Sequence, residues 1–314
     1  MNQTIEVRVP ATSANLGPGF DCLGLALDLF NTFRMTIGAP FAIEVTGESS
    51  ERLPRGEENA VVQAMRCVFE DAEMPLDALP TFSLHLDNQI PVSSGLGSSA
   101  SAIVGGIVLG NAVIQQVAPS RVRSLARLLE LATEMEGHPD NVAPALFGGC
   151  ILVFRDKIGL RTTPVPIPEG LRFVAATPDF ALSTEEARKV LPAMYPRAEV
   201  IDNVAQCARL MLALSTDNLD LLRGGLVDHL HEPYRRPLVP GAQEVAAAAV
   251  DAGALAVTIS GAGPTLLAWC QAESAVTIAD EMTLAWLNAG IPCRALSLRP
   301  AQTITAARCL DTPT

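Results

Sequence analysis

The chain has 314 residues, of which 49% are apolar and 18% are charged, and its formal net charge is −12. This composition predicts a globular protein of about two domains that buries a large core, and it argues against disorder. The acidic balance, without a cluster of Lys or Arg, excludes broad contact with nucleic acid or an anionic membrane surface. Any phosphate group therefore has to be bound locally.

The N-terminal residues 1–6 show no basic stretch followed by an apolar core. The apolar run at residues 102–114 is too short and too rich in glycine to span a bilayer. We therefore expect a cytoplasmic protein without a membrane partner. The cysteines are odd in number, scattered and without metal-ligand spacing, which predicts reduced core residues at positions 22, 67, 150, 207, 270, 293 and 309.

The first part of the chain predicts strands and one capped helix. Alternating apolar residues indicate a strand at 5–9, which runs into a polar loop rich in Gly and Pro at 10–21. In that loop Asn15 and Asp21 either make turns to nearby amides or contact a ligand. Strands are expected at 23–29, 33–37, 41–45 and 81–86, and Asn59 is expected to cap a helix at 60–72.

The stretch from Pro91 to Ser101 is rich in small residues and precedes the apolar run 102–114. Gly95 and Gly97 permit backbone conformations and close approaches that a Cβ would block, and Ser98 stands at the expected helix N-cap. Free amides and the helix dipole at such a turn bind anions. The alternative is a turn that only caps a buried helix.

Two familiar nucleotide motifs do not fit this stretch. No Lys or Arg occurs between Arg66 and Arg121, which excludes a Walker A loop. A dinucleotide fingerprint requires a buried strand before the loop and an acidic residue about 20 positions later. The preceding segment alternates like a strand with one buried face, and the first acid after the loop is Glu130.

A helix expected to start at residues 119–120 ends at a group of acidic residues. Glu134 and Glu136 stand at its end, and Asp140 and Asn141 follow a turn. Acids are disfavoured at a helix C-terminus, so this cluster favours a compact site for a hard cation such as Mg²⁺, with phosphate supplying other ligands. A solvated helix end is the alternative. His138 is interpreted as a structural or substrate-contacting residue.

The second half alternates strands with helices, which indicates an α+β sandwich. The proline-containing segment 155–170 predicts a connection between domains, with the boundary near residue 160. Ser183 and Glu186 fit a capping box, and histidines at 229 and 231 point apart on a helix, which argues against zinc. Residues 261–264 form either a tight turn or a loop packed against the first glycine-rich loop. Strands are expected at 171–177, on both sides of 260–265 and at 293–298, with helices at 184–191, 199–214, 219–230, 243–252 and 275–288.

Four segments together resemble the motifs of the GHMP kinase superfamily, and within it those of the homoserine kinases. They are residues 13–21, 95–99, 136–141 and 260–265, in the superfamily order. The resemblance implies an α+β, two-domain GHMP kinase fold: an N-terminal mixed α/β nucleotide-binding domain over 1–160 and a C-terminal ferredoxin-like α+β sandwich over 161–314. It also implies ATP, Mg²⁺ and transfer of the γ-phosphoryl group to the hydroxyl of L-homoserine in threonine biosynthesis, and it is compatible with a homodimer.

The resemblance also assigns roles to residues of this chain. Asp140 and Asn141 are expected at the reacting groups, and the metal is expected on Ser98 or Ser99 together with Glu136, with Glu134 as the alternative. The substrate pocket is expected to contain Asn15, Asp21, His138, Thr184, Arg188 and Arg235. The nucleotide is expected to contact Asn59, Pro91, Val92, Ser93, Ser94, Gly95, Leu96, Gly97, Ser98, Ser99, Ala100, Ser101, Gly261 and Gly263.

Elementary chemistry agrees with these roles. A zwitterionic substrate needs a cation for its carboxylate, which Arg188 or Arg235 supplies, and an anion for its ammonium, which Asp21 supplies. Thr12 and Ser13 stand where many superfamily members carry a Lys. A Lys-assisted catalytic Asp is therefore not expected. Two other readings remain: a kinase of the mevalonate type, and a non-catalytic ligand-binding regulator.

Overall fold

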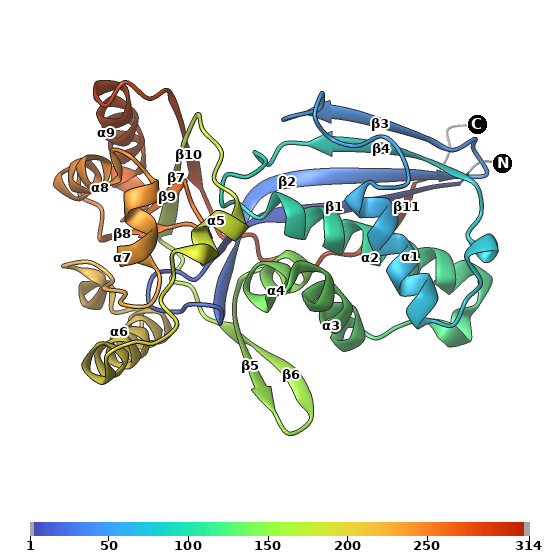
Figure 1. Cartoon of the computed structure of the whole chain (residues 1–314), viewed down its shortest axis with the longest axis horizontal. Helices are drawn as coiled ribbons and strands as arrows, with labels where there is room; N and C mark the ends of the chain where they lie inside the picture. Colours follow the sequence, from blue (N-terminus) through green and yellow to red (C-terminus); the bar gives the residue numbers. More distant parts are fainter. Residues whose placement is uncertain (1–2, 311–314) are drawn as a thin grey trace.

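The computed structural model describes residues 3–310, and its first half is built on a mixed sheet (Figure 1). Within those residues the sheet has seven strands: five follow the order β11-β1-β2-β4-β3, β5 also pairs with β2, and β6 pairs with β5. The pair β3–β4 is parallel and the other pairs are antiparallel. The strands are β1 (Gln3–Ala14), β2 (Leu23–Ile37), β3 (Ala42–Gly47), β4 (Phe82–Asn88), β5 (Cys150–Asp156), β6 (Gly159–Val165) and β11 (Ala307–Leu310).

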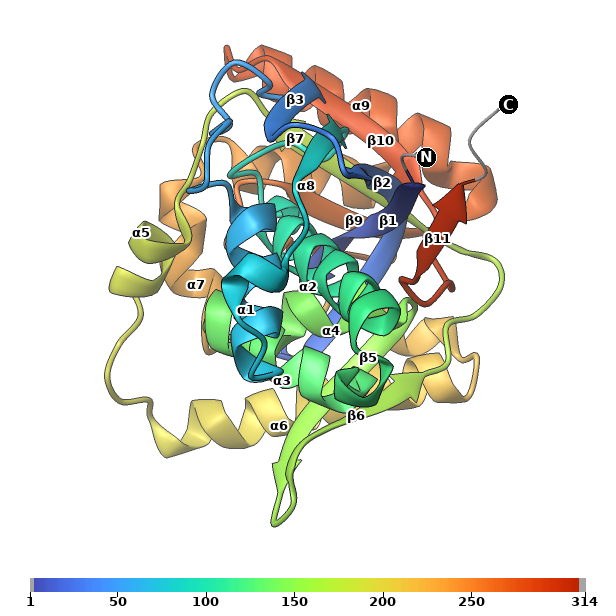
Figure 2. The ribbon, with the colours of Figure 1, turned by 90° about the vertical axis from the view of Figure 1, so that its right-hand side faces the viewer.

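Four helices cover one face of this sheet, with α2 in the middle (Figures 1 and 2). They are α1 (Ala60–Asp71), α2 (Ser98–Val117), α3 (Leu125–Glu136) and α4 (Pro139–Phe147). Two glycines allow α2 to pack closely, because a Cβ on Gly105 would meet the Phe33 ring at 2.4 Å. A Cβ on Gly106 would meet the Val61 carbonyl at 2.3 Å. As predicted, Asn59 caps α1 through the Val61 amide.

The helix α2 extends beyond the predicted apolar run and is long and apolar enough, by length and composition, to cross a membrane. Of its most apolar window, 67% is buried inside the protein. Its apolar character follows from this position, because its residues pack on β1, α1, α3 and α4 in one hydrophobic core.

The second sheet has the strand order β10-β7-β9-β8 and is antiparallel throughout. It consists of β7 (Leu171–Pro178), β8 (Ala256–Ile259), β9 (Leu266–Gln271) and β10 (Cys293–Leu298). The helices α8 (Ala242–Asp251) and α9 (Ala275–Asn288) cover its outer face. Because α8 precedes β8 and α9 joins β9 to β10, this is the ferredoxin-like β-α-β-β-α-β order. The predicted fold class is confirmed.

A second hydrophobic core lies between the two sheets and includes α6 (Arg197–Ser215). In this core Leu23 and Leu25 of β2 pack with Phe173 of β7, Trp269 of β9 and Leu210 of α6. The ends of β1 and β2 therefore reach into the second half of the chain. Both short helices α5 (Thr184–Lys189) and α7 (Glu232–Arg235) lie near this junction (Figure 1).

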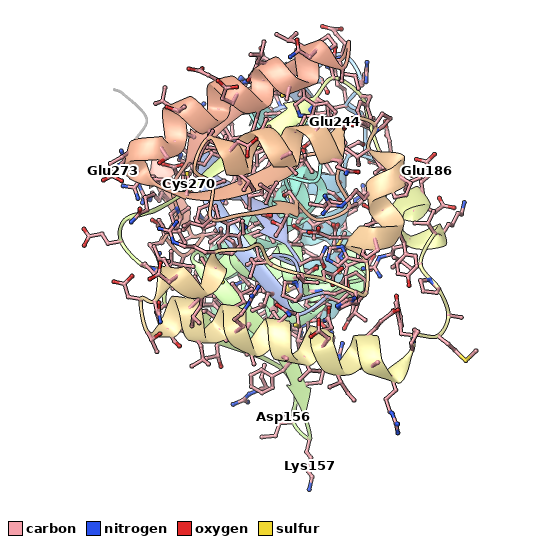
Figure 3. All side chains as sticks on the ribbon, turned by 90° about the vertical axis from the view of Figure 1, so that its left-hand side faces the viewer. Asp156, Lys157, Glu186, Glu244, Cys270 and Glu273 are labelled. Atoms are coloured by element: carbon pink, nitrogen blue, oxygen red, sulfur yellow. The ribbon has the colours of Figure 1, made fainter. Side chains whose placement is uncertain are left out.

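The structure corrects some local predictions for strands. The strands expected at 23–29 and 33–37 are one strand, β2, because a shift in register at Pro10/Ala11 lets both parts pair with β1. The expected linker at 155–170 contains β6, which forms a hairpin with β5. Its tip, marked by Asp156 and Lys157, projects from the body of the protein (Figure 3). The C-terminal strand β11, which was not predicted, pairs with the edge of β1 in the first sheet.

Two helix predictions also change. The helix expected at 219–230 is reduced to a 3-10 turn at Leu219–Leu222, because Gly224 and Gly225 take positive φ values of 84° and 89°. The helix expected to start at 119–120 begins instead after Ser124, whose side chain accepts from the Arg127 amide. The division of the chain into two domains at residue 160 stays a prediction.

Candidate active site

The glycine-rich loop ends at Gly97, which takes a left-handed conformation (φ 72°) and is the N-cap of α2. Ser98, the predicted N-cap, is instead the first helical residue. Position 97 requires a glycine, because a Cβ there would lie 2.0 Å from Thr12 Oγ1 on β1. Among the described residues no side chain caps this helix end, so its first-turn amides are free for an anion.

A second loop, which contains residues 261–264, packs against the glycine-rich loop. Of the two alternatives for these residues, an isolated tight turn or a packed loop, the structure therefore shows the packed loop. Ser260 Oγ donates to the Gly95 carbonyl at 2.7 Å, and the Thr265 amide donates to the Ser94 carbonyl at 3.1 Å. The contact is so close that a Cβ on Gly95 would lie 2.2 Å from the Ser260 carbonyl oxygen. The loop between β8 and β9 therefore holds the glycine-rich loop in place.

These loops border a cavity of about 360 Å³, within the usual range for small-molecule sites. Residues that the sequence did not single out line its apolar part, among them Phe33, Leu53 and Pro54. They come from separate segments, so no local pattern marks them. Of the predicted nucleotide residues, Leu96, Ala100 and Ser101 are buried in the interior and, like Pro91, do not line the cavity. The predicted nucleotide residues that line it are Asn59, Val92, Ser93, Ser94, Gly95, Gly97, Ser98, Ser99, Gly261 and Gly263.

The two candidate metal carboxylates lie in different surroundings. Glu136 Oε2 accepts from Ser99 Oγ at 2.9 Å and lines the cavity. Burial raises the pKa of Glu136 above its ordinary value, although Ser99 and His138 oppose this shift. Glu134 is 62% exposed and pairs with Arg127 at 3.3 Å. Residues two apart on a helix face different directions, which explains why only Glu136 contacts the glycine-rich loop.

A second, smaller cavity of about 20 Å³ collects all the predicted substrate and catalytic residues. It shares Asn141, Thr184, Gly261 and Ala262 with the larger cavity, so the two adjoin there. The predicted residues around it are Asn15, Asp21, His138, Asp140, Asn141, Thr184, Arg188 and Arg235.

Opposite charges pair across this smaller cavity. Arg188 Nη2 lies 2.7 Å from Asp21 Oδ1, and Arg188 Nη1 lies 3.3 Å from Asp21 Oδ2. Asp21 and Asn15 have positive φ values of 56° and 71°, and Asn15 Oδ1 accepts from the Asp21 amide. Asn and Asp adopt the left-handed conformation more readily than most other residues with a side chain, because they form local hydrogen bonds of this kind, so the two residues suit the turn that brings them to the cavity.

Asp140 lies in the first turn of α4, a helix where the sequence predicted only a turn; Pro139 suits its first position. The Asp140 side chain is almost fully buried, and its Oδ1 lies 3.5 Å from His138 Nδ1. Burial alone would lower the pKa of His138, but the neighbouring Asp140 outweighs it and raises that pKa. Within the described residues Asp140 Oδ1 has no hydrogen-bond partner. A buried acceptor in this state suits a ligand hydroxyl.

Asn141 and Thr12 form a direct contact at the junction of the two cavities. Thr12 Oγ1 donates to Asn141 Oδ1 at 2.8 Å, and Asn141 lines both cavities. Thr12 is one of the residues that replace the superfamily Lys. A neutral hydroxyl therefore orients Asn141, the neighbour of Asp140 in the chain.

Comparison with known proteins agrees with this geometry. Residues 59–149 match the GHMP kinases N terminal domain, and residues 202–288 match the GHMP kinases C terminal family. The homoserine kinase of Moorella thermoacetica is 45% identical, over 94% of this chain and 96% of that protein. The homoserine kinase of Trichormus variabilis is 43% identical, with the same coverage of both chains.

A solved structure shares the whole fold. The crystal structure of homoserine kinase from Cytophaga hutchinsonii superposes with a TM-score of 0.83 and 29% identity, covering 98% of this chain and 97% of that one. The resemblance inferred from the sequence motifs is confirmed, and the chain belongs to the homoserine kinase family of the GHMP kinases.

Proposed function

We propose that this chain transfers the γ-phosphoryl group of ATP to the hydroxyl of L-homoserine, giving O-phospho-L-homoserine for threonine biosynthesis. The observation that carries this proposal is the junction of the two cavities. One is bordered by a helix N-terminus with free amides, and the other by two carboxylates and two guanidinium groups. A phosphate donor and a zwitterionic alcohol therefore meet beside Asn141.

The pairing of Asp21 with Arg188 suggests how the amino acid binds. The α-ammonium of homoserine replaces Arg188 as the partner of Asp21, and its carboxylate takes the guanidinium groups of Arg188 and Arg235. Charge balance in the pocket is preserved by this exchange. The side chain of the bound substrate then extends towards Asp140 and Asn141, which hold the hydroxyl.

The residues near the glycine-rich loop fit Mg²⁺. Ser99 Oγ and Glu136 Oε2 are oxygen donors 2.9 Å apart, as a hard cation requires. Among the described residues no group of three or more His, Cys, Asp or Glu is placed to hold a metal, so phosphate and water would supply the other ligands. When bound, the cation neutralises charge on the phosphate oxygens. Ser98 stays a further candidate.

A mevalonate-type kinase is the second candidate, but mevalonate has no ammonium group to pair with Asp21. A non-catalytic regulator would be expected to lack the metal carboxylate or the glycine-rich loop, and both are present. The decisive test is ATP consumption with L-homoserine, L-serine, mevalonate and 4-hydroxybutyrate. We expect the largest kcat/KM for homoserine, and equal or greater turnover of mevalonate would contradict the proposal.

We also expect a cytoplasmic enzyme that does not bind nucleic acid or membranes; the oligomeric state stays open, with a homodimer as one candidate. Apolar residues exposed on α6, including Ile201, Val204 and Leu212, offer a surface for a second copy. Light scattering of the purified protein measures the oligomeric state directly.

Substitutions of the two carboxylates at the end of α3, Glu136 and Glu134, should change the Mg²⁺ dependence of activity to different extents. Glu136→Gln should raise the Mg²⁺ concentration needed for half-maximal activity by about tenfold, because an amide is a weaker ligand for a hard cation. Glu134→Gln, which changes an exposed partner of Arg127, is the matched control and should stay close to the wild type. Titration of activity with Mg²⁺ at saturating ATP makes the comparison. The reverse ranking would move the metal site to Glu134.

A further inference from the structure

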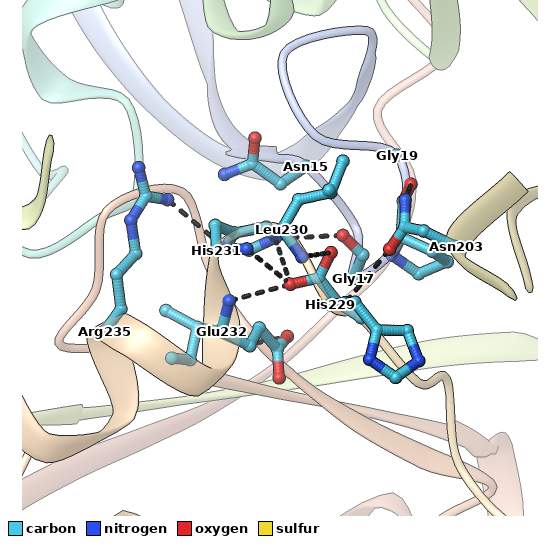
Figure 4. A network of polar contacts seen from close by, with 12 residues as sticks. Asn15, Gly17, Gly19, Asn203, His229, Leu230, His231, Glu232 and Arg235 are labelled. Atoms are coloured by element: carbon cyan, nitrogen blue, oxygen red, sulfur yellow. Dashed lines mark hydrogen bonds and ion pairs between the residues drawn. The ribbon is translucent and has the colours of Figure 1, made fainter. Parts of the chain in front are cut away.

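A fully buried histidine, His231, lies directly behind the substrate pocket, just before α7. From the sequence, His231 was considered only as a zinc ligand, and a zinc site was not expected. Figure 4 shows its ring between Arg235 on one side and the backbone of Gly17 on the other. His231 Nε2 lies 2.9 Å from the Gly17 carbonyl oxygen, and His231 Nδ1 lies 3.3 Å from Arg235 Nη1.

These two contacts define the protonation of the ring. A carbonyl oxygen only accepts, so Nε2 carries the hydrogen and donates to Gly17. A guanidinium only donates, so Nδ1 is bare and accepts from Arg235. The neutral Nε2–H tautomer is the one form that satisfies both contacts. Burial, aided by the positive charge of Arg235, lowers the pKa of His231, which agrees with this assignment although Asp228 opposes it.

Arg235 is held on several sides by neutral acceptors. Its Nε donates to the Ala187 carbonyl at 3.1 Å, and its Nη1 donates to the Gly261 carbonyl at 2.9 Å as well as to His231. Within the described residues Nη2 takes part in none of these bonds. The guanidinium is therefore fixed in direction while one amino group stays available to a ligand.

The Gly17 contact belongs to the loop that carries Asn15 and Asp21. Asn15 Nδ2 donates to the same Gly261 carbonyl that accepts from Arg235. Asn203 of α6 holds the next residue of the loop, because its Nδ2 donates to the Pro18 carbonyl at 3.0 Å. The loop and Arg235 thus share two connections, one through Gly261 and one through His231.

The segment before α7 keeps the ring in place. Asp228 is buried and accepts from the amides of His231 and Glu232 at 2.8 and 2.7 Å. The Phe20 ring stacks on His231 with centroids 5.1 Å apart, and Arg235 lies 5.3 Å from the same Phe20 ring. The imidazole therefore has little freedom to turn.

We propose that His231 is a positioning residue that joins the two charge-recognising halves of the substrate pocket. Through Nδ1 it fixes Arg235 for the substrate carboxylate, and through Nε2 it fixes the loop of Asp21 for the substrate ammonium. This inference rests on the proposed function, because it takes homoserine as the zwitterion that both halves recognise.

Two substitutions separate the two contacts. His231→Asn keeps an acceptor near the Nδ1 position and loses the donor to Gly17, whereas His231→Gln keeps a donor near the Nε2 position and loses the acceptor for Arg235. The substrates are homoserine, 3-amino-1-propanol, which lacks the carboxylate, and 4-hydroxybutyrate, which lacks the ammonium. The ratio of two kcat/KM values from one preparation is independent of the fraction of folded enzyme.

We expect His231→Gln to lower the preference for homoserine over 3-amino-1-propanol by about tenfold, with a smaller change against 4-hydroxybutyrate. His231→Asn should show the opposite pattern, and KM for ATP should stay unchanged in both variants. Tyr195→Phe is the matched control, because it removes a hydrogen bond to the Leu230 carbonyl in the same segment without touching Arg235 or Gly17. An equal loss for all three substrates, or the same pattern in Tyr195→Phe, would overturn the proposal.

Histidine ¹⁵N NMR of the wild type tests the same assignment without any variant enzyme. The chain has four histidines, which makes the spectrum simple. We expect His231 as the neutral Nε2–H tautomer at neutral pH, and an Nδ1–H or doubly protonated ring would overturn the proposal. Absence of wild-type turnover with homoserine would instead refute the proposed function, and the tautomer would still report whether Nδ1 is free to accept from Arg235.

Discussion

Asp140→Asn should keep kcat within about tenfold of the wild type, whereas Asp140→Ala should lose about 100-fold or more. Phosphoryl transfer through a loose transition state depends on positioning and charge neutralisation more than on early removal of the hydroxyl proton. An asparagine keeps the shape of the side chain and one acceptor, so it still holds the homoserine hydroxyl in line. An alanine removes the acceptor entirely.

The structure supplies the reason for this expectation. Asp140 Oδ1 is buried and unpartnered among the described residues, with His138 Nδ1 at 3.5 Å as its neighbour. Thr12 orients the adjacent Asn141, and residues 12 and 13 offer hydroxyls in place of a lysine. We therefore infer that Asp140 positions the homoserine hydroxyl and that the proton leaves to the phosphate itself.

Single-turnover and steady-state kinetics over a range of pH measure both variants. General-base catalysis accounts for about 10² to 10⁴-fold. If Asp140→Asn falls by such a factor and also loses the pH dependence of kcat below neutrality, Asp140 is the base and the positioning hypothesis is wrong. Pro139→Ala, next to Asp140 in the first turn of α4, tests whether a general disturbance of this helix start has the same effect.

The second large effect is expected at the two arginines. Arg188→Ala and Arg235→Ala should each raise KM for homoserine by about tenfold to 100-fold with little change in KM for ATP, because each removes a charge-assisted contact worth about 1.5–3 kcal/mol. Arg235 is buried, and its loss removes the side-chain donor to the Ala187 carbonyl and one of the two side-chain donors to the Gly261 carbonyl, the other being Asn15. Arg235→Ala should therefore also lower thermal stability.

Arg188 is half-exposed and pairs with Asp21 in the free protein, so its alanine variant should fold normally. The control is Arg223→Ala, which breaks an exposed ion pair with Asp220 on the surface and should leave both KM values unchanged. Steady-state kinetics with each substrate varied in turn makes the measurement. Loss of ATP affinity with intact homoserine affinity in both variants would show that the pocket assignment is wrong.

The turns and helix caps of the site could be predicted from the sequence, because each of them is formed by the backbone and side chains of one short segment. Gly95 and Gly97 predicted a turn that only small residues can form, and Asn59 and Ser183 predicted helix caps that the structure contains. The alternation of strands and helices in the second half likewise predicted the α+β sandwich. These signals depend on neighbours within a few positions, so no tertiary information was needed.

Contacts between distant segments were decided only by the tertiary structure. Glu136 and Glu134 look alike in the sequence, and the packing of α3 against α2 places Glu136 at Ser99, whereas Glu134 pairs with Arg127 of its own helix. The sequence predicted a linker where the structure has β6, which is a strand because it pairs with β5. The strand β11 was not predicted, because it forms by pairing with the edge of β1, at the other end of the chain. His231 contacts Gly17 across 214 positions of sequence. Such pairings depend on which surfaces come into contact when the two sheets bury their shared core. The hydrophobic periodicity of one segment does not indicate which distant segment it will contact.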